Sequence, residues 1–289
     1  MTKKIVIYHG SCPDGFGAAV SAWLALGDEA EYLAVDHGEP APDVTGKEVF
    51  IVDFAFGLAE TQRMDAQADS LVILDHHETS MQKLHGFRCR CGGFVFDMGK
   101  SGARLAWEYF HPGNPVPSLV AHIEDRDLFK WELEASRPFL AELDKLPYDF
   151  QVWKRVLEMS AGEYSEFIKP GVVAHEKYMS LCHEIAKDAR PIELDGQAGL
   201  QVNCHPVFVD DVGQILFDRT GTFAAMWHVG THPSIKVSLR AGPGFRVKEL
   251  AEAFGGGGHP RSAAFRLPLT RFDELSQGRV LTAESVPVN

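Results

Sequence analysis

Three short apolar runs in the first hundred residues set the strongest constraint on how this chain folds. They cover residues 5–8, 49–52 and 71–74, and each is rich in Val, Ile and Leu but too short for a helix. Helix-like segments such as 15–26 and 58–68 alternate with them. This alternation is typical of an α/β fold, in which a parallel sheet carries helices on both faces.

Each apolar run is followed by side chains that bind metal ions. Because the carboxyl ends of parallel strands are where such sheets bind ligands, we expect these side chains to converge on one crevice. One Asp at a strand end is usually the N-cap of the next helix, so the prediction depends on all three ends together. The side chains, in chain order, are His9, Asp14, Asp53, Asp75, His76 and His77.

Such a crevice needs cations, since buried carboxylates without them repel one another. Asp and His together select hard to borderline ions, and a shared carboxylate can hold two of them. We therefore predict two Mn²⁺ ions, with Mg²⁺ as the alternative. The five cysteines are scattered and form no C-x-x-C pair, so they indicate neither a disulfide framework nor a structural zinc site.

The second half of the chain predicts a separate domain. Beyond Asp97 the pattern becomes helical, and residues 162–189 predict one or two helices with a break at Pro170-Gly171. Strands return from Arg190 onward. We predict an N-terminal parallel-sheet metal domain over residues 1–160, a helical linker over 161–189 and a smaller α/β domain over 190–289.

A glycine run in this second domain can bind an anion. Consecutive glycines let several backbone N–H groups approach a phosphate, and the following imidazole adds a donor. The alternative is a flexible hinge. We predict that Gly256, Gly257, Gly258 and His259 bind the substrate.

These motifs together resemble the DHH phosphoesterase superfamily. Asp75-His76-His77 follows an apolar strand, with His9 to Asp14 and Asp53 before it. The run from Gly255 to Pro260 is similar to the glycine-rich signature of the DHH-associated C-terminal domain of RecJ-like and short-oligonucleotide phosphodiesterases. The resemblance covers nearly the whole chain.

The resemblance assigns a role to each motif. It makes Asp75 a residue that orients its neighbour and His77 a contact of the phosphate or leaving group, and it gives Arg240 the terminal phosphate. The fourth motif is an acidic residue in a helix, for which we choose Asp125 with Asp127 in reserve. The implied metal ligands are His9, Asp14, Asp53, which bridges the two ions, His76 and Asp125.

The first motif departs from the family pattern. Many members place two aspartates two residues apart beside the glycine, whereas this chain reads Cys12-Pro13-Asp14-Gly15-Phe16. Either Cys12 or Phe16 therefore occupies an aspartate position, and one metal site loses a carboxylate. Cys12 is then either a thiolate ligand or an inert buried cysteine.

The formal net charge of −12 argues against binding to a long, extended nucleic acid. We expect the chain to bind a short nucleotide substrate and to bind neither long nucleic acid nor a membrane. A homodimer is possible, and we expect a cytoplasmic location. The predicted activity is a metal-dependent phosphodiesterase that releases mononucleotides from dinucleotides, nano-RNA or cyclic dinucleotides. The alternatives are a manganese-dependent pyrophosphatase or exopolyphosphatase, and a non-catalytic nucleotide-binding protein.

Overall fold

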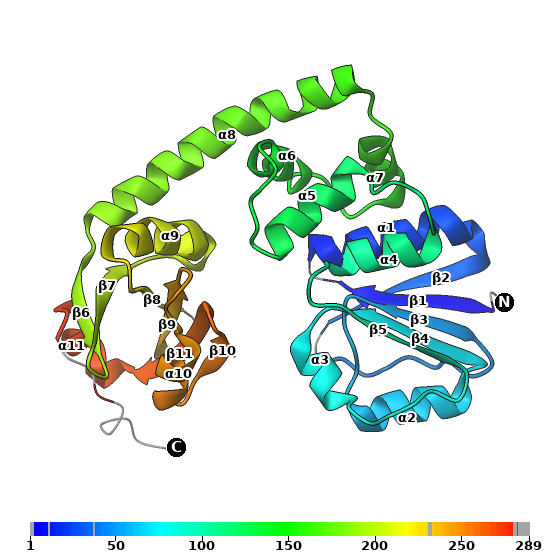
Figure 1. The fold of residues 1–289 in the computed structure, drawn as a ribbon, viewed down its shortest axis with the longest axis horizontal. Coiled ribbons are helices and arrows are strands. Elements are labelled where there is room, and N and C mark those ends of the chain that lie inside the picture. Colours follow the sequence, from blue (N-terminus) through cyan, green and yellow to red (C-terminus); the bar gives the residue numbers. More distant parts are fainter. Residues whose placement is uncertain (1–2, 11, 37, 231–232, 280–281, 283–289) are drawn as a thin grey trace. The chain divides into compact units, whose positions relative to one another are not determined.

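The computed structural model describes residues 3–10, 12–36, 38–230, 233–279 and 282 (Figure 1). The chain separates into two compact units, residues 1–175 (unit 1) and 176–289 (unit 2). The boundary between them falls inside one helix, α8 (Ala161–Lys187). The three-part division at residues 160 and 189 stays a prediction.

Unit 1 contains a five-stranded, entirely parallel sheet with the strand order β2-β1-β3-β4-β5. The expected strands are all present, and two more lie at the sheet edges. The strands are β1 (Lys4–His9), β2 (Ala30–Val35), β3 (Glu48–Val52), β4 (Ser70–Asp75) and β5 (Gly92–Phe96).

Helices cover both faces of this sheet, as the apolar strand sequences require. Ile5 and Ile7 pack with Met64 of α2 on one face, whereas Val6 packs with Ala18 of α1 on the other. Figure 1 shows α1 and α4 on one side of the sheet and α2 on the other. The helices of unit 1 before α8 are α1 (Pro13–Leu26), α2 (Leu58–Gln67), α3 (Glu78–Lys83), α4 (Gly102–Phe110), α5 (Ser118–Asp127), α6 (Ser136–Leu143) and α7 (Phe150–Leu157).

The predicted break at Pro170-Gly171 is wrong, because α8 continues through it. A proline removes one backbone hydrogen bond but does not end a helix that tertiary packing holds on both sides. Phe167 and Ile168 pack against the core of unit 1 just before the proline. Gly171 lies so close to the Pro138 carbonyl oxygen that any side chain there would collide with it.

Unit 2 contains a six-stranded mixed sheet with the order β10-β11-β9-β8-β7-β6. Only β7 and β8 run parallel; the other neighbours are antiparallel. The strands are β6 (Arg190–Leu194), β7 (Gln197–Asn203), β8 (Phe223–Val229), β9 (Ser234–Ala241), β10 (Gly257–His259) and β11 (Ser262–Pro268), and the helices are α9 (Val209–Thr220), α10 (Lys248–Ala253) and α11 (Phe272–Ser276).

Two helices pack on opposite faces of this sheet. Leu250 of α10 packs with Val237 and Phe265, whereas Leu216 of α9 packs with Met226. Side chains alternate between the faces along each strand, so the strand sequences sort into an α10 side and an α9 side. Among the described residues, no helix is both long and apolar enough to cross a bilayer.

A buried polar chain ties three helices of unit 1 together. His122 of α5 lies 2.9 Å from the Ser136 hydroxyl through Nδ1 and 2.7 Å from the Tyr164 hydroxyl of α8 through Nε2. Ser136 in turn donates to the buried carboxylate of Asp125. Burial lowers the pKa of His122 below its ordinary value of 6.5, although the charge of Asp125 opposes the shift.

This lowered pKa predicts how stability depends on pH. The unfolded chain binds a proton at His122 more readily than the folded chain, so this residue's contribution is present above pH 6.5 and is lost as pH falls below it. We expect His122→Gln to lower the free energy of unfolding by about 1–3 kcal/mol at pH 7.5. The difference in the free energy of unfolding between variant and wild type, measured by urea denaturation, should be smaller at pH 5.5 than at pH 7.5. A larger difference at pH 5.5 would contradict the proposed pH dependence.

Candidate metal centre

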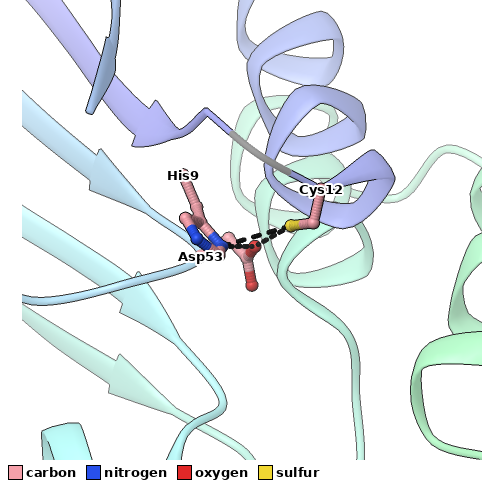
Figure 2. A group of neighbouring side chains, drawn as sticks. All are labelled: His9, Cys12 and Asp53. Atoms are coloured by element: carbon pink, nitrogen blue, oxygen red, sulfur yellow. Dashed lines mark hydrogen bonds and ion pairs between the residues drawn. The ribbon is translucent and has the colours of Figure 1, made fainter. Parts of the chain in front are cut away.

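The first part of the site joins the ends of β1 and β3 to the start of α1 (Figure 2). His9 Nδ1 lies 3.2 Å from Cys12 Sγ and 3.6 Å from Asp53 Oδ2, and the thiol lies 3.3 Å from the same oxygen. In the sheet, β1 lies between β2 and β3, so the chain first adds β2 on one side of β1 and then β3 on the other. The side chains therefore lie at the point where the strand order reverses, the usual ligand site of such a sheet.

Asp53 is held in an uncommon backbone conformation. Its φ of 64° lies in the left-handed region, which Asp tolerates better than most residues, and its N–H donates to the Leu74 carbonyl at 2.9 Å. Only 1% of the residue is exposed. Gly102 packs directly against this side chain, and a Cβ there would lie 2.5 Å from Asp53 Oδ1. The carboxylate therefore has one fixed position.

The N-terminus of α4 binds the carboxylate of Asp14. The backbone N–H of Gly102 donates to Asp14 Oδ2 at 2.6 Å, and that of Ala103 donates to Oδ1 at 2.8 Å. The Ser101 hydroxyl caps the same helix by accepting from Arg104 N. Free N–H groups at a helix start favour negative charge. They stabilise Asp14 as an anion at a position that is only 2% exposed.

His76, directly after β4, is surrounded by three carboxylates. Its Nε2 lies 3.6 Å from Asp14 Oδ2, 3.3 Å from Asp53 Oδ1 and 3.4 Å from Asp127 Oδ2. Asp127 is the last residue of α5 and lies 51 positions after His76 in the sequence. The imidazole thus stands where three negative side chains meet.

Asp75 fixes the two histidines that follow it. Its buried Oδ1 accepts from the backbone N–H of His76 at 2.7 Å and of His77 at 3.2 Å, and it lies 2.7 Å from His77 Nδ1. The His77 side chain is 36% exposed. Because Nδ1 faces the carboxylate, the histidine presents Nε2 as its free nitrogen.

The donor atoms fall into groups that share members. Within the part of the chain that the structure describes, three sets of ligand atoms each lie within 4.8 Å of one another. Asp53 belongs to two of the sets, with Oδ2 on the side of His9 and Oδ1 on the side of His76. The sets are His9, Cys12 and Asp53; Asp53, His76 and His77; and Asp14, His76 and Asp127.

The charges in the site shift several pKa values. Burial raises the pKa of Asp14 well above its usual value, and repulsion from Asp53 and Asp127 raises it further. Burial also raises the pKa of Asp127. For Asp53, burial opposes ionisation, but hydrogen bonds with His76 and His9 outweigh it and hold the pKa below its usual range. Of the carboxyl groups of Asp14, Asp53 and Asp127, that of Asp53 therefore has the lowest pKa and the strongest preference for the ionised form.

Both histidines that face Asp53 gain proton affinity. The hydrogen bond with Asp53 raises the pKa of His9, although burial opposes it. At His76, burial also lowers the pKa, but the hydrogen bond with Asp53 and the charge of Asp127 reverse the shift. Protons here partly offset the carboxylate charge, which is the task that a divalent cation performs in a metal centre.

The structure brings most of the predicted ligands together but leaves Asp125 outside the groups. Its Oδ1 accepts from Glu132 N at 2.8 Å, and its Oδ2 accepts from Leu133 N at 3.2 Å and from the Ser136 hydroxyl. Both oxygens are thus engaged with the loop that follows α5. Asp127, the reserve choice, takes the place in the cluster.

The structure also places the two candidates of the altered first motif. Cys12 is the N-cap of α1, where its thiol accepts from Gly15 N, and it lies in the cluster. Phe16 points into the aromatic core, with its ring 4.9 Å from that of Trp153 and stacked 5.0 Å from that of Tyr148. Burial and the charge of Asp53 raise the pKa of the Cys12 thiol.

In unit 2 the glycine run from Gly255 to Gly258 has a structural role. Gly255, with φ 73°, follows α10, and the N–H groups of Gly255 and Gly256 donate to Glu252 and Ala251 to end the helix. Gly256 and Gly258 approach β11 too closely to carry a side chain. A side chain at Gly257 would meet no neighbouring atom, and the His259 residue is exposed. The run therefore turns the chain sharply from helix to strand.

Arg240 lies near the end of β9, on the α9 side of the sheet. Its Nε donates to Asp210 Oδ1 at 2.7 Å and its Nη1 donates to the Leu239 carbonyl at 2.9 Å. In the part of the chain that the structure describes, no hydrogen bond from its Nη2 is found. Ser262, which follows the glycine run, pairs directly with Arg240 across the sheet.

The sequence of the chain has recognisable relatives. A family model described as the DHHA1 domain matches residues 209–278. An uncharacterized protein, R106, from Acanthamoeba polyphaga mimivirus is 25% identical over 287 residues. The match covers 88% of this chain, and the chain spans 65% of the length of that relative.

Solved structures share the fold. A pGpG-specific phosphodiesterase, PggH, from Vibrio cholerae superposes with a TM-score of 0.57 at 13% identity, covering 95% of this chain and 96% of that one. The DHH domain of a protein described as a member of a ribosomal-protein family gives a TM-score of 0.65 at 12% identity, covering 95% and 85%. Residues 209–278 thus match the DHHA1 domain, and the chain shares its fold with these two structures over 95% of its length.

Proposed function

We propose that this chain is a metal-dependent phosphodiesterase that releases mononucleotides from short nucleotide substrates. The observation that carries the proposal is the shared carboxylate of Asp53, whose two oxygens face two different groups of donors. A carboxylate shared in this way is the feature that lets two cations act on one phosphate. The DHHA1 match and the likeness to a pGpG-specific phosphodiesterase support the choice of substrate class.

The residues present fit divalent cations. Asp53 Oδ1 is buried 3.3 Å from His76 Nε2 without a well-aligned hydrogen bond, and three carboxylates meet around this imidazole. One group would contain His9 and Asp53 with Cys12 beside them; the other would contain Asp14, Asp53, His76 and Asp127. Imidazole with carboxylate suits Mn²⁺, with Mg²⁺ as the alternative. When bound, such cations offset phosphate charge and lower the pKa of water.

The remaining residues orient the substrate and move protons. Asp75 holds His77 through Nδ1, which leaves Nε2 to contact a phosphate oxygen or to donate a proton to a leaving oxygen. Asp75 itself is fully buried and acts as a positioning residue. The amides of α4 hold Asp14 in position and oppose the rise in its pKa that burial causes.

Unit 2 would bind the substrate away from the reacting phosphate. Arg240 offers its open Nη2 group, and the backbone from Gly256 to Gly258 together with His259 offers further donors. We propose a short nucleotide as the partner, rather than long nucleic acid or a membrane. The cytoplasmic location and the homodimer stay predictions.

A hydrolysis screen tests the proposed function. The full chain with Mn²⁺ is offered a 5′-phosphorylated dinucleotide, a cyclic dinucleotide and inorganic pyrophosphate, and products are separated by ion-exchange chromatography. We expect mononucleotides from the linear dinucleotide at the highest turnover. Release of phosphate from pyrophosphate alone would replace the proposal with a pyrophosphatase, and no turnover at all with nucleotide binding retained would replace it with a binding protein.

Asp53→Asn tests the shared carboxylate. Asn also tolerates a positive φ, so the fold should persist, but one oxygen facing the two donor groups is replaced by an N–H donor. We expect Mn²⁺ binding measured by calorimetry to fall below two equivalents and turnover to fall more than about hundredfold. Asp69→Asn, at the opposite end of β4, is the matched control. Two equivalents of Mn²⁺ with full turnover would remove the proposed role.

A paired comparison separates Asp127 from Asp125. Asp127→Asn should weaken Mn²⁺ binding without destabilising the metal-free chain, because it removes a carboxylate that repels Asp53. Asp125→Asn should lower the free energy of unfolding by about 1–3 kcal/mol, since it disrupts two hydrogen bonds from the following loop and one from Ser136 of α6. Urea denaturation in the presence of a chelator measures both. The opposite pattern would return the ligand role to Asp125.

A further inference from the structure

A hollow in the surface of unit 1 is lined by residues that the proposed metal centre does not use. It has a volume of about 540 Å³, and its lining residues are Pro13, Arg126, Asp144, Leu146 and Tyr148. Leu146 and Tyr148 come from the loop between α6 and α7. A volume of this size is typical of sites that bind small molecules.

Two of the lining residues adjoin predicted metal ligands in the sequence. Pro13 lies between Cys12 and Asp14 at the start of α1. Arg126 directly precedes Asp127 at the end of α5. The hollow is therefore bordered by the same two helix ends that supply donors to the cluster. A group attached to a phosphate at the metal centre would lie at the edge of this hollow.

Tyr148 forms a flat aromatic wall of the hollow. Its ring stacks on that of Phe16, with the centroids 5.0 Å apart and the planes inclined by 16°. The ring of Trp153 lies nearly perpendicular to it at 5.7 Å. Phe16 and Trp153 are buried and hold the tyrosine in place, yet Tyr148 itself is 45% exposed. Because Phe16 covers one face of the ring, the other face is left to line the hollow.

The charged residues of the hollow neutralise each other. Arg126 Nη1 donates to both carboxylate oxygens of Asp144, at 3.0 and 2.8 Å. This pairing argues against a second phosphate as the occupant, because the carboxylate would repel it. Among the described residues no acceptor is found for Arg126 Nε or Nη2, so donors remain beside the carboxylate. A flat, uncharged ring with donors and acceptors on its edge fits this combination, and a nucleobase is such a ring.

We propose that the hollow is a nucleobase site, in which the base of a nucleotide whose phosphate lies at the metal centre stacks on the open face of Tyr148. The polar edge of the base then faces Arg126 and Asp144. This inference rests on the proposed function and makes it more specific, because it gives unit 1 a contact with the base. Since stacking tolerates every base, Tyr148 selects nucleotides over simple phosphates rather than one base over another.

The test measures equilibrium binding, so that it does not depend on turnover. Calorimetry with the full chain and Mn²⁺ compares AMP with ribose 5-phosphate, which has the same sugar and phosphate but no base. We expect wild type to bind AMP more tightly. Tyr148→Ala should weaken AMP binding about tenfold, the scale of one stacked base, and leave ribose 5-phosphate binding unchanged. Tyr148→Phe keeps the ring and should bind AMP like wild type.

Two further variants complete the design. Tyr148→Leu keeps an apolar contact with Phe16 but removes the flat ring, so it should lose the preference for AMP without a change in packing. Tyr109→Ala removes a tyrosine of similar exposure, 42%, from α4 and should bind both ligands like wild type.

The outcomes separate the base site from the proposed function. A preference for AMP that persists in Tyr148→Leu, or an equal loss of both ligands in the Tyr148 variants, would overturn the base site. Turnover of dinucleotides by an enzyme that binds AMP and ribose 5-phosphate equally would also refute the base site and leave the proposed function intact. Base-dependent binding through Tyr148 without turnover of any substrate would instead refute only the proposed catalytic function.

Discussion

The metal centre depends on one constraint, the repulsion among carboxylates that the fold brings into a small buried space. Asp14 and Asp53 are almost fully buried and share the imidazole of His76 with Asp127. Charges placed in this way are costly unless each receives a specific compensation. Asp14 receives two backbone N–H groups of α4, and Asp53 receives the contacts of His9 and His76. Asp53 Oδ1 nevertheless faces His76 Nε2 at 3.3 Å without a well-aligned hydrogen bond, so its compensation is incomplete.

Much of the surrounding backbone serves this constraint. The left-handed conformation of Asp53 directs its carboxylate across the end of the sheet, and Gly102 leaves room for it. Ser101 caps α4, so the amides that it does not use are available to Asp14. A site held by strained backbone and a helix end is well suited to keep negative groups in place before a cation arrives.

The strand ends could be predicted from sequence because a parallel sheet brings its carboxyl ends to one edge. His9, Asp53 and His76 therefore needed only the strands to be identified. Asp127 could not be chosen over Asp125, because the decision depends on a tertiary contact: Asp125 bonds to the loop and to Ser136, eleven positions further along the chain. The continuous α8 was missed for a related reason, since packing before and after Pro170 holds a helix that local propensity would end.

The two units would meet the anionic substrate that we propose in different ways. Unit 1 concentrates carboxylates, so it would attract a phosphate only after cations had reversed the local charge. Unit 2 would need no cation, because Arg240 supplies a positive charge of its own. The net charge of −12 would repel a polyanion, and this repulsion would grow with every further nucleotide, so the charge of the chain favours the short substrate that we propose.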